Sequence, residues 1–467
     1  MKPTHVILVS AIAAAAAAGP GPVFAQTRTT DAVFIETRPD PARGQRLDVT
    51  VSSAAGYDKD DSLGGGALGG IGLVGPAGES VTLAASASYA LVGHRTQLRA
   101  TAASTTRYYG SLDSMLHSSD NDASRSGAVG FLYHTNDTTF VANQTANYAS
   151  SLLYNLIPGT GVITPGQAPA ATTDYGLSNS DIYAYNSAAE YRRRLATRNF
   201  VSARIEWEHS DMSGGRADGH ILNVYKGRAG VSRHVTRNFT ATAEYVYRYG
   251  DIASGRVVAY GQVLQENGAE FGFDYRRPLS ATRGLTMQVR VGGSMIALPA
   301  ANLVTASPDG TALDAVGVLD RRYDQYSGQV FASYDFGRSW QASGSIRRGI
   351  EYVSGLGEPV VADSFTARID GLLTQRIDVL GTAAYASGAS AVNQVASLFD
   401  TYTASVRLRY GFTHTWATYV EYLYYFYDSR GTLPLVPGLP PNVERNAFRV
   451  GLMLRMPAVG KVDRVTR

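Results

Sequence analysis

The stretch Thr401–Phe426, TYTASVRLRYGFTHTWATYVEYLYYF, predicts two long amphipathic β-strands joined by a tight turn at Thr413-His414-Thr415. Alternate positions carry mostly apolar or aromatic residues: Tyr402, Ala404, Val406, Leu408, Tyr410 and Phe412, then Trp416, Thr418, Val420, Tyr422, Tyr424 and Phe426. Successive side chains of a strand point to opposite faces, so this set shares one face. The other face carries charges and hydroxyls, including Arg407, Arg409 and Glu421.

The length of these strands indicates where they lie. Each has about 11 residues, whereas strands of globular proteins usually have about 5–6. At roughly 3.3 Å per residue and a tilt near 45°, such a strand spans about 25 Å, the height of the apolar band of an outer-membrane barrel. The stretch therefore predicts a transmembrane hairpin.

The N-terminus has the layout of a signal peptide. Lys2 supplies a basic region, residues 6–18 an apolar run, and Val23-Phe24-Ala25 a small-residue cleavage site. We expect cleavage after residue 25, leaving Gln26 first. The alternative is an uncleaved anchor helix, but the run is short and ends at Gly19-Pro20-Gly21-Pro22. No later segment has about 20 consecutive apolar residues, so the sequence predicts no transmembrane helix.

Composition excludes several classes of protein. The chain of 467 residues contains no cysteine, which excludes a disulfide framework, a lipoprotein anchor, thiolate metal sites and a thiol nucleophile. The net charge of +3 gives no argument for binding nucleic acid. Mean hydropathy near zero disfavours a helical membrane protein. It suits a membrane barrel, in which only alternate residues meet lipid.

The same alternation recurs from about residue 45 to near the end of the chain. It predicts an all-β fold, a single transmembrane antiparallel up-and-down β-barrel of about 18 strands (16–18), with short periplasmic turns and long extracellular loops. The weakest strand predictions are those near Phe140 and Ile221. The predicted divisions are a signal peptide (1–25), a periplasmic tail (26–44), the barrel (45–457) and a C-terminal tail (458–467).

A degenerate repeat marks the predicted short turns. Its copies are Thr197-Arg198-Asn199-Phe200, Thr236-Arg237-Asn238-Phe239, Thr282-Arg283-Gly284-Leu285 and Thr413-His414-Thr415-Trp416. Longer segments rich in Gly, Pro, Ser and Asp alternate with these turns. A β-propeller also repeats about every 40 residues. Its strands would be shorter and its connections similar to one another, so the barrel is favoured.

In lipid an open sheet edge is costly, so the first strand, near Leu47, should pair with the last, near Leu452. A ring of about 18 strands is too wide for side chains to fill and leaves an aqueous lumen unless loops plug it. Two long connections are candidates to fold inward and narrow it, residues 150–180 and residues 298–320. A mobile extracellular loop is the alternative for the first of them.

Charged residues on the predicted inner face are the candidate site. They are Arg204, Glu206, Arg248, Arg290, Arg368, Arg407, Arg409, Glu421, Arg449 and Arg455. Such residues tune which solutes pass, or they neutralise one another and keep the lumen wet. The arginines of the final strands would place like charges side by side, which is unfavourable unless an anionic ligand, lipopolysaccharide or facing carboxylates offset them.

The sequence offers no defensible catalytic or metal-binding set, and we expect no enzyme activity, metal or cofactor. The eight histidines are scattered, and Asp58-Lys59-Asp60-Asp61 is better explained as a solvated loop than as a cation site. The glycines of residues 64–70 lack the Lys-Ser/Thr of a phosphate-binding loop. An outer-membrane lipase or protease stays open as an enzymatic alternative.

The chain resembles Gram-negative outer-membrane β-barrel porins, and most of all the group known as β-barrel porin 2, some of whose members accompany exopolysaccharide-export genes. Gly56-Tyr57-Asp58-Lys59-Asp60 is similar to the Gly-Tyr-Asp-Asp-Asn opening common there. The strand from Phe448 to Met456 resembles the signal read by the barrel-assembly machinery. Such signals usually end on an aromatic residue, whereas here Pro457 and a polar tail follow.

The resemblance implies an outer-membrane location and a channel for hydrophilic solutes. The basic cluster of the last strands adds a preference for anions. The alternatives are a conduit for exopolysaccharide export, for which Tyr419 and Tyr425 on the inner face leave room, and a structural or adhesive barrel. Expected partners are outer-membrane lipid and lipopolysaccharide, the barrel-assembly machinery and the solute or polysaccharide, with no nucleic acid. A homo-oligomer is left open.

Overall fold

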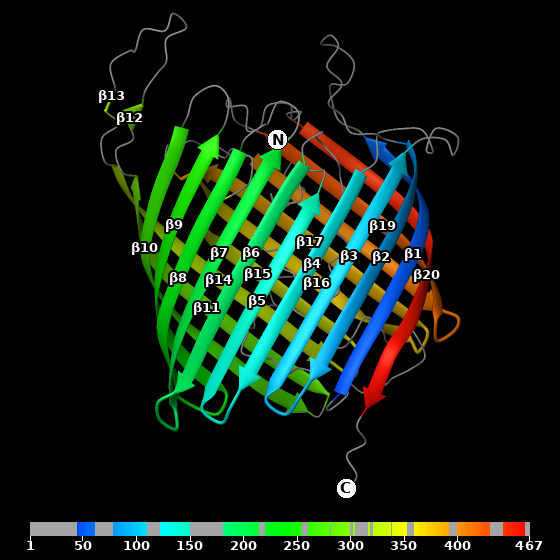
Figure 1. Ribbon diagram of the computed structural model, residues 1–467, viewed down its shortest axis with the longest axis horizontal. Coiled ribbons are helices and arrows are strands. Elements are labelled where there is room, and N and C mark those ends of the chain that lie inside the picture. The colour runs from blue at the N-terminus through cyan, green and yellow to red at the C-terminus, as the bar shows by residue number, and fades with distance from the viewer. Residues whose placement is uncertain are drawn as a thin grey trace, which may run out of the picture.

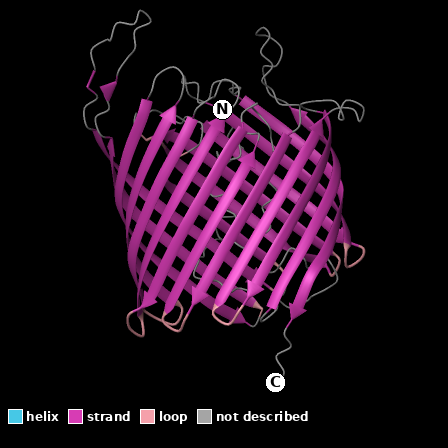
Figure 2. Ribbon diagram, in the orientation of Figure 1, coloured by secondary structure: helices cyan, strands magenta, loops and turns pink. Residues whose placement is uncertain are grey.

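Eighteen antiparallel strands form one closed ring in the computed structural model (Figure 1). The structure describes residues 44–60, 78–109, 122–149, 181–213, 220–254, 260–280, 282–298, 302–303, 316–317, 321–337, 339–352, 359–391, 399–429 and 442–462. These residues contain strands and turns (Figure 2), and none of them belongs to a helix long and apolar enough to cross a membrane. The predicted all-β up-and-down barrel is confirmed.

The strands follow one another around the ring in chain order. They are β1 (Gly44–Asp60), β2 (Gly78–Val92), β3 (Thr96–Tyr109), β4 (Asp122–His134), β5 (Thr138–Ala149), β6 (Asp181–Arg194), β7 (Asn199–Ser213), β8 (His220–His234), β9 (Phe239–Ser254), β10 (Tyr260–Ser280), β11 (Arg283–Leu298), β14 (Arg321–Phe336), β15 (Gln341–Glu351), β16 (Val360–Thr374), β17 (Ile377–Ser390), β18 (Phe399–Gly411), β19 (Trp416–Ser429) and β20 (Asn442–Val462). The strands expected to be weakest, near Phe140 and Ile221, are present as β5 and β8.

The first and last strands close the ring as expected. β1 pairs with β20 along its whole length, with Ser53 opposite Leu452. β20 continues to Val462, past the barrel end predicted at residue 457. A register shift at Leu47/Asp48 accompanies this extension, beside Pro457. Proline has no N–H to donate and is tolerated in strands next to such irregularities.

Threonine hydroxyls explain part of the turn repeat. At one end of the barrel, which we call the short-turn end, consecutive strands are joined by tight connections (Figure 1). Thr413 Oγ1 accepts hydrogen bonds from the backbone N–H groups of Thr415 (3.2 Å) and Trp416 (2.8 Å). Thr236 Oγ1 accepts one from Asn238 (3.2 Å). A hydroxyl that satisfies backbone N–H groups two or three residues later favours a tight turn.

The two candidate constriction segments are only sparsely represented among the described residues. Residues 150–180 lie outside them. Of residues 299–320, only β12 (Asn302–Leu303) and β13 (Val316–Gly317) are described, and they pair with each other. Figure 1 shows this small ladder beyond the barrel end opposite the short turns, not inside the ring. The described part of this segment therefore does not narrow the lumen.

Candidate functional site: the interior of the barrel

A hydrogen bond across the ring identifies its inner face. Arg248 of β9 donates from Nη1 to the carbonyl oxygen of Ile350 in β15, at 2.7 Å. Three strands, β10, β11 and β14, separate these two in the wall, so the bond passes through the interior. Tyr245 and Tyr247, on the opposite face of β9, must then point outward, and they are exposed.

The outer face is apolar and uncovered. Large hydrophobic side chains such as Ile205 (67 % exposed), Phe271 (64 %) and Val406 (54 %) lie on it. In a water-soluble protein such residues would be packed in a core. A band of this kind is typical of a surface surrounded by hydrocarbon.

All ten predicted site residues lie on the inner face, because each alternates with outward hydrophobic residues of its own strand. They are Arg204 and Glu206 (β7), Arg248 (β9), Arg290 (β11), Arg368 (β16), Arg407 and Arg409 (β18), Glu421 (β19), and Arg449 and Arg455 (β20). They do not meet at one point, since they come from seven strands distributed around the ring. Their effect on solutes stays a prediction.

Carboxylates face the arginines of the final strands. Arg409 is paired with Asp378 of β17, with Nε 3.2 Å from Oδ1. Arg455 Nη2 lies 3.1 Å from Asp48 Oδ1 across the closing seam. Glu421 lies opposite Arg407 in the strand register, and its Oε2 is 4.0 Å from Arg449 Nη1. Facing carboxylates, one of the three expected compensations, therefore offset this basic cluster.

The same pairing continues around the wall. Arg204 Nη2 lies 3.4 Å from Glu206, and Arg290 Nη1 lies 3.4 Å from Asp274. The remaining two pairs are Arg368–Asp370 at 2.9 Å and Arg248–Glu266 at 2.8 Å. The Arg290–Asp274 and Arg248–Glu266 pairs join neighbouring strands, where opposite charges stabilise a sheet, whereas the other two pairs join residues two apart in one strand.

Sequence reasoning left several of the paired partners out of the candidate site. They are Asp48, Glu190, Lys226, Glu266 and Asp378. Their inward orientation can be read from the alternation of each strand. What singles them out is the strand register, which no single strand reveals.

Part of the interior is apolar and closely packed. Leu222, Val224, Leu264 and Ile296 line the inner wall from β8 to β11 and are almost fully buried. The chain segment at the end of β15 packs against them through Ile350 and Tyr352. This segment lies inside the ring, since Arg248 bonds it across the interior. We call it the β15 plug, residues 350–352; it narrows the lumen where no constriction was predicted.

The inward tyrosines of β19 are packed rather than open to the lumen. Tyr425 is 2 % exposed and Tyr427 is 1 % exposed, and Tyr419 packs closely on Gly451. A polymer moving through the lumen could stack only on accessible rings. These residues therefore give no support to a sugar-binding aromatic path.

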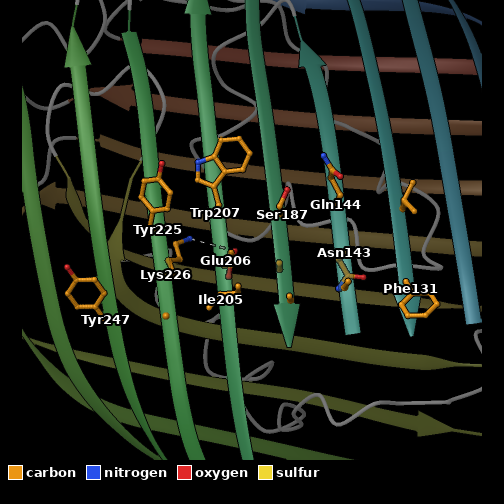
Figure 3. A pocket seen from close by; sticks show the side chains of 15 residues that line it. Phe131, Asn143, Gln144, Ser187, Ile205, Glu206, Trp207, Tyr225, Lys226 and Tyr247 are labelled. Carbon is orange, nitrogen blue, oxygen red and sulfur yellow. Dashed lines mark ion pairs between the residues drawn. The ribbon is translucent and has the colours of Figure 1, made fainter. Parts of the chain in front are cut away.

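A hollow of about 610 Å³ lies in the outer wall from β4 to β9 (Figure 3). Bulky outward side chains, including Phe131, Trp207 and Tyr225, surround small residues such as Ala142. Gln144, a primary amide, also lines it. The mix of large and small side chains indents the surface of the wall here.

The described residues contain no group of three or more His, Asp or Glu placed to hold a metal ion. His134 of β4 and His234 of β8 line one hollow at the short-turn end, whereas His209 of β7 lies beside Asn223 of β8.

No family model matches this chain. No curated protein matches it either. Among solved structures, OccAB4 of Acinetobacter baumannii is similar over 90 % of this chain and 100 % of its own, with 11 % identity and a TM-score of 0.39. OpdQ of Pseudomonas aeruginosa has 11 % identity over 89 % and 98 % of the two chains, with a TM-score of 0.39. The ferric-catecholate import receptor Fiu of E. coli K12 has 7 % identity over 90 % and 82 %, with a TM-score of 0.42. Likeness at this level assigns no role to any residue.

Proposed function

We propose that this protein is a channel of the Gram-negative outer membrane that lets hydrophilic solutes pass. One observation carries the proposal: a closed ring of strands has an uncovered apolar outer face and an inner face of paired charges. The first feature suits hydrocarbon and the second suits water. The short-turn end then faces the periplasm, as the prediction from the sequence has it.

Export through a cleaved signal peptide is part of this proposal, with Gln26 as the first residue of the mature chain. N-terminal sequencing of the protein purified from outer membranes tests it. A chain that retains residues 1–25 would contradict the cleavage. Assembly by the barrel-assembly machinery through the β20 strand belongs to the same proposal.

Conductance of the refolded full-length protein in planar lipid bilayers tests the channel. We expect discrete current steps in potassium chloride, reduced in size by the β15 plug. A barrel that inserts but stays silent would contradict the proposal. Insertion is checked independently by heat-modifiable migration on gels, which reports a closed barrel with or without current.

Export of an exopolysaccharide and a structural or adhesive role are the other candidates. Export gains no support from the inward tyrosines of β19, because these side chains are buried. Loss of surface polymer on deletion of the gene would favour export over diffusion.

A further inference from the structure

A second hollow, lined mostly by polar residues, lies inside the ring at the short-turn end. It has a volume of about 490 Å³, and the strands from β4 to β11 and the turns between them contribute to it. Its inward side chains include Arg192 and Arg194 of β6, His234 of β8 and Arg276 of β10. A space of this size suits a small organic ligand.

The charges in this hollow differ from those of the rest of the lumen. At the same end of the barrel, on β18 and β20, Arg409 and Arg455 each face a carboxylate. In the part of the chain that the structure describes, Arg192, Arg237 and Arg276 form no ion pair, although all three line the hollow. Two carboxylates also line it: Asp137 lies 3.7 Å from Arg194 within the hollow, and Asp274 lies 3.4 Å from Arg290 outside its lining. The hollow therefore has an excess of positive charge.

An aromatic ring holds two of the guanidinium groups together. The guanidinium carbon of Arg192 lies 4.6 Å from the centroid of the Phe200 ring, and that of Arg194 lies 5.7 Å from it. The His234 ring meets the same phenyl group edge-on, at 4.8 Å. Stacking on a ring orients a guanidinium but does not neutralise it. Arg194 already has Asp137 beside it, so Arg192 is the guanidinium over this ring that is left to bind a further anion.

Backbone hydrogen bonds tie the other cations to the same place. The backbone N–H of Arg276 donates to the carbonyl oxygen of Asn238, at 2.8 Å. Asn238 follows Arg237 in the β8–β9 turn, and the hydroxyl of Thr236 accepts from its backbone N–H. The Arg237 and Arg276 backbones are thus anchored beside each other rather than carried on free loops.

We propose that this hollow binds the carboxylate or phosphate group of a hydrophilic solute, with Arg192 and Arg276 as its principal ligands. This proposal rests on the channel function proposed above. In such a channel the hollow is the place at the periplasmic end where the solute binds. Guanidinium groups bind both oxyanions through pairs of parallel N–H···O bonds, which accounts for the shared chemistry.

Isothermal titration of the refolded full-length protein in detergent tests the site without requiring current. Sodium glucuronate is the probe and glucose is its uncharged counterpart. We expect glucuronate to bind, glucose to give no heat, and the double variant Arg192→Gln/Arg276→Gln to weaken binding about tenfold or more. Inorganic phosphate as a competitor distinguishes a general oxyanion site from a site for carboxylated sugars. Displacement of glucuronate by phosphate indicates the first, and failure to displace it indicates the second.

Arg193→Gln is the matched control. Arg193 stands between Arg192 and Arg194 but alternates to the outer face of β6, with Tyr191. This substitution removes one positive charge at the height of Arg192, and we expect glucuronate affinity to change less than about twofold. Absence of glucuronate binding to the wild type, or an equal loss in Arg193→Gln, would overturn the site. A silent bilayer with intact binding would instead overturn the channel and leave the site standing.

Discussion

Arg248 and Ile350 are joined across the lumen by a hydrogen bond of 2.7 Å, although three strands separate them in the barrel wall. The same guanidinium also lies 2.8 Å from Glu266 Oε2, and both side chains are 7 % exposed. One arginine thus holds the β15 plug in place and neutralises a buried carboxylate. The neutralised carboxylate leads to a prediction about stability, and the position of the β15 plug leads to a prediction about conductance.

Arg248→Ala is expected to destabilise the folded barrel, because it leaves the Glu266 carboxylate buried without a counter-charge. Removing one partner of a buried pair typically costs about 3–5 kcal/mol. Arg204→Ala is the control: Arg204 also belongs to inward ion pairs, but it is 43 % exposed, so we expect about 0–1 kcal/mol. Urea unfolding in micelles, followed by tryptophan fluorescence, measures both. Equal losses in the two variants would contradict this account of burial.

Tyr352→Ala should widen the lumen, since the Tyr352 ring packs against Gly250 of β9 from inside the ring. We expect the single-channel conductance to increase about twofold, as pore-lining side chains set the open cross-section. Tyr326→Ala removes an equal ring from the outer face, where Tyr326 is 66 % exposed, and should leave the conductance unchanged. No increase in Tyr352→Ala would show that the current follows another path.

Glu421→Gln should shift ion selectivity toward chloride. Glu421 compensates Arg407 and Arg449, so its loss leaves two cations without a facing carboxylate. The reversal potential in a potassium chloride gradient is expected to show a rise of about twofold in the chloride-to-potassium permeability ratio. Glu79→Gln, near the start of β2 and on its outer face, is the control and should not shift it. An unchanged reversal potential in Glu421→Gln would place the ion path away from this wall.

Gln144→Leu is expected to stabilise the barrel. Gln144 faces outward midway between Phe140 and Tyr148 of β5, and its amide has no hydrogen-bond partner among the described residues. An unpaired amide in hydrocarbon costs about 2 kcal/mol or more. Asn267→Leu should bring no such gain, because Asn267 accepts a hydrogen bond from the Tyr245 hydroxyl at 2.6 Å. Urea unfolding in lipid vesicles measures the two.

Cross-linking in vesicles extends the Gln144 test to oligomeric state. If Gln144→Leu destabilised the protein and abolished a cross-linked oligomer, the amide would bond to a second copy. The expected gain in stability would then be wrong, and the homo-oligomer left open by the sequence would gain support.

Alternation in the sequence determined the strands, their inward and outward faces, the closure of β1 on β20 and the inward position of Arg204, Arg449 and the other candidate residues. It could do so because a period of two is a local property of the chain. A wall with an apolar outer face and a polar inner face also leaves few alternatives for which side chains point outward. The tertiary structure alone decided which carboxylate faces which arginine, as with Arg455 and Asp48, which are 407 residues apart in the chain. It also decided that the end of β15 enters the lumen, and that Arg192 and Arg276 line one hollow. Register and ring closure bring these groups together, and both depend on pairing between strands rather than on the pattern within any one of them.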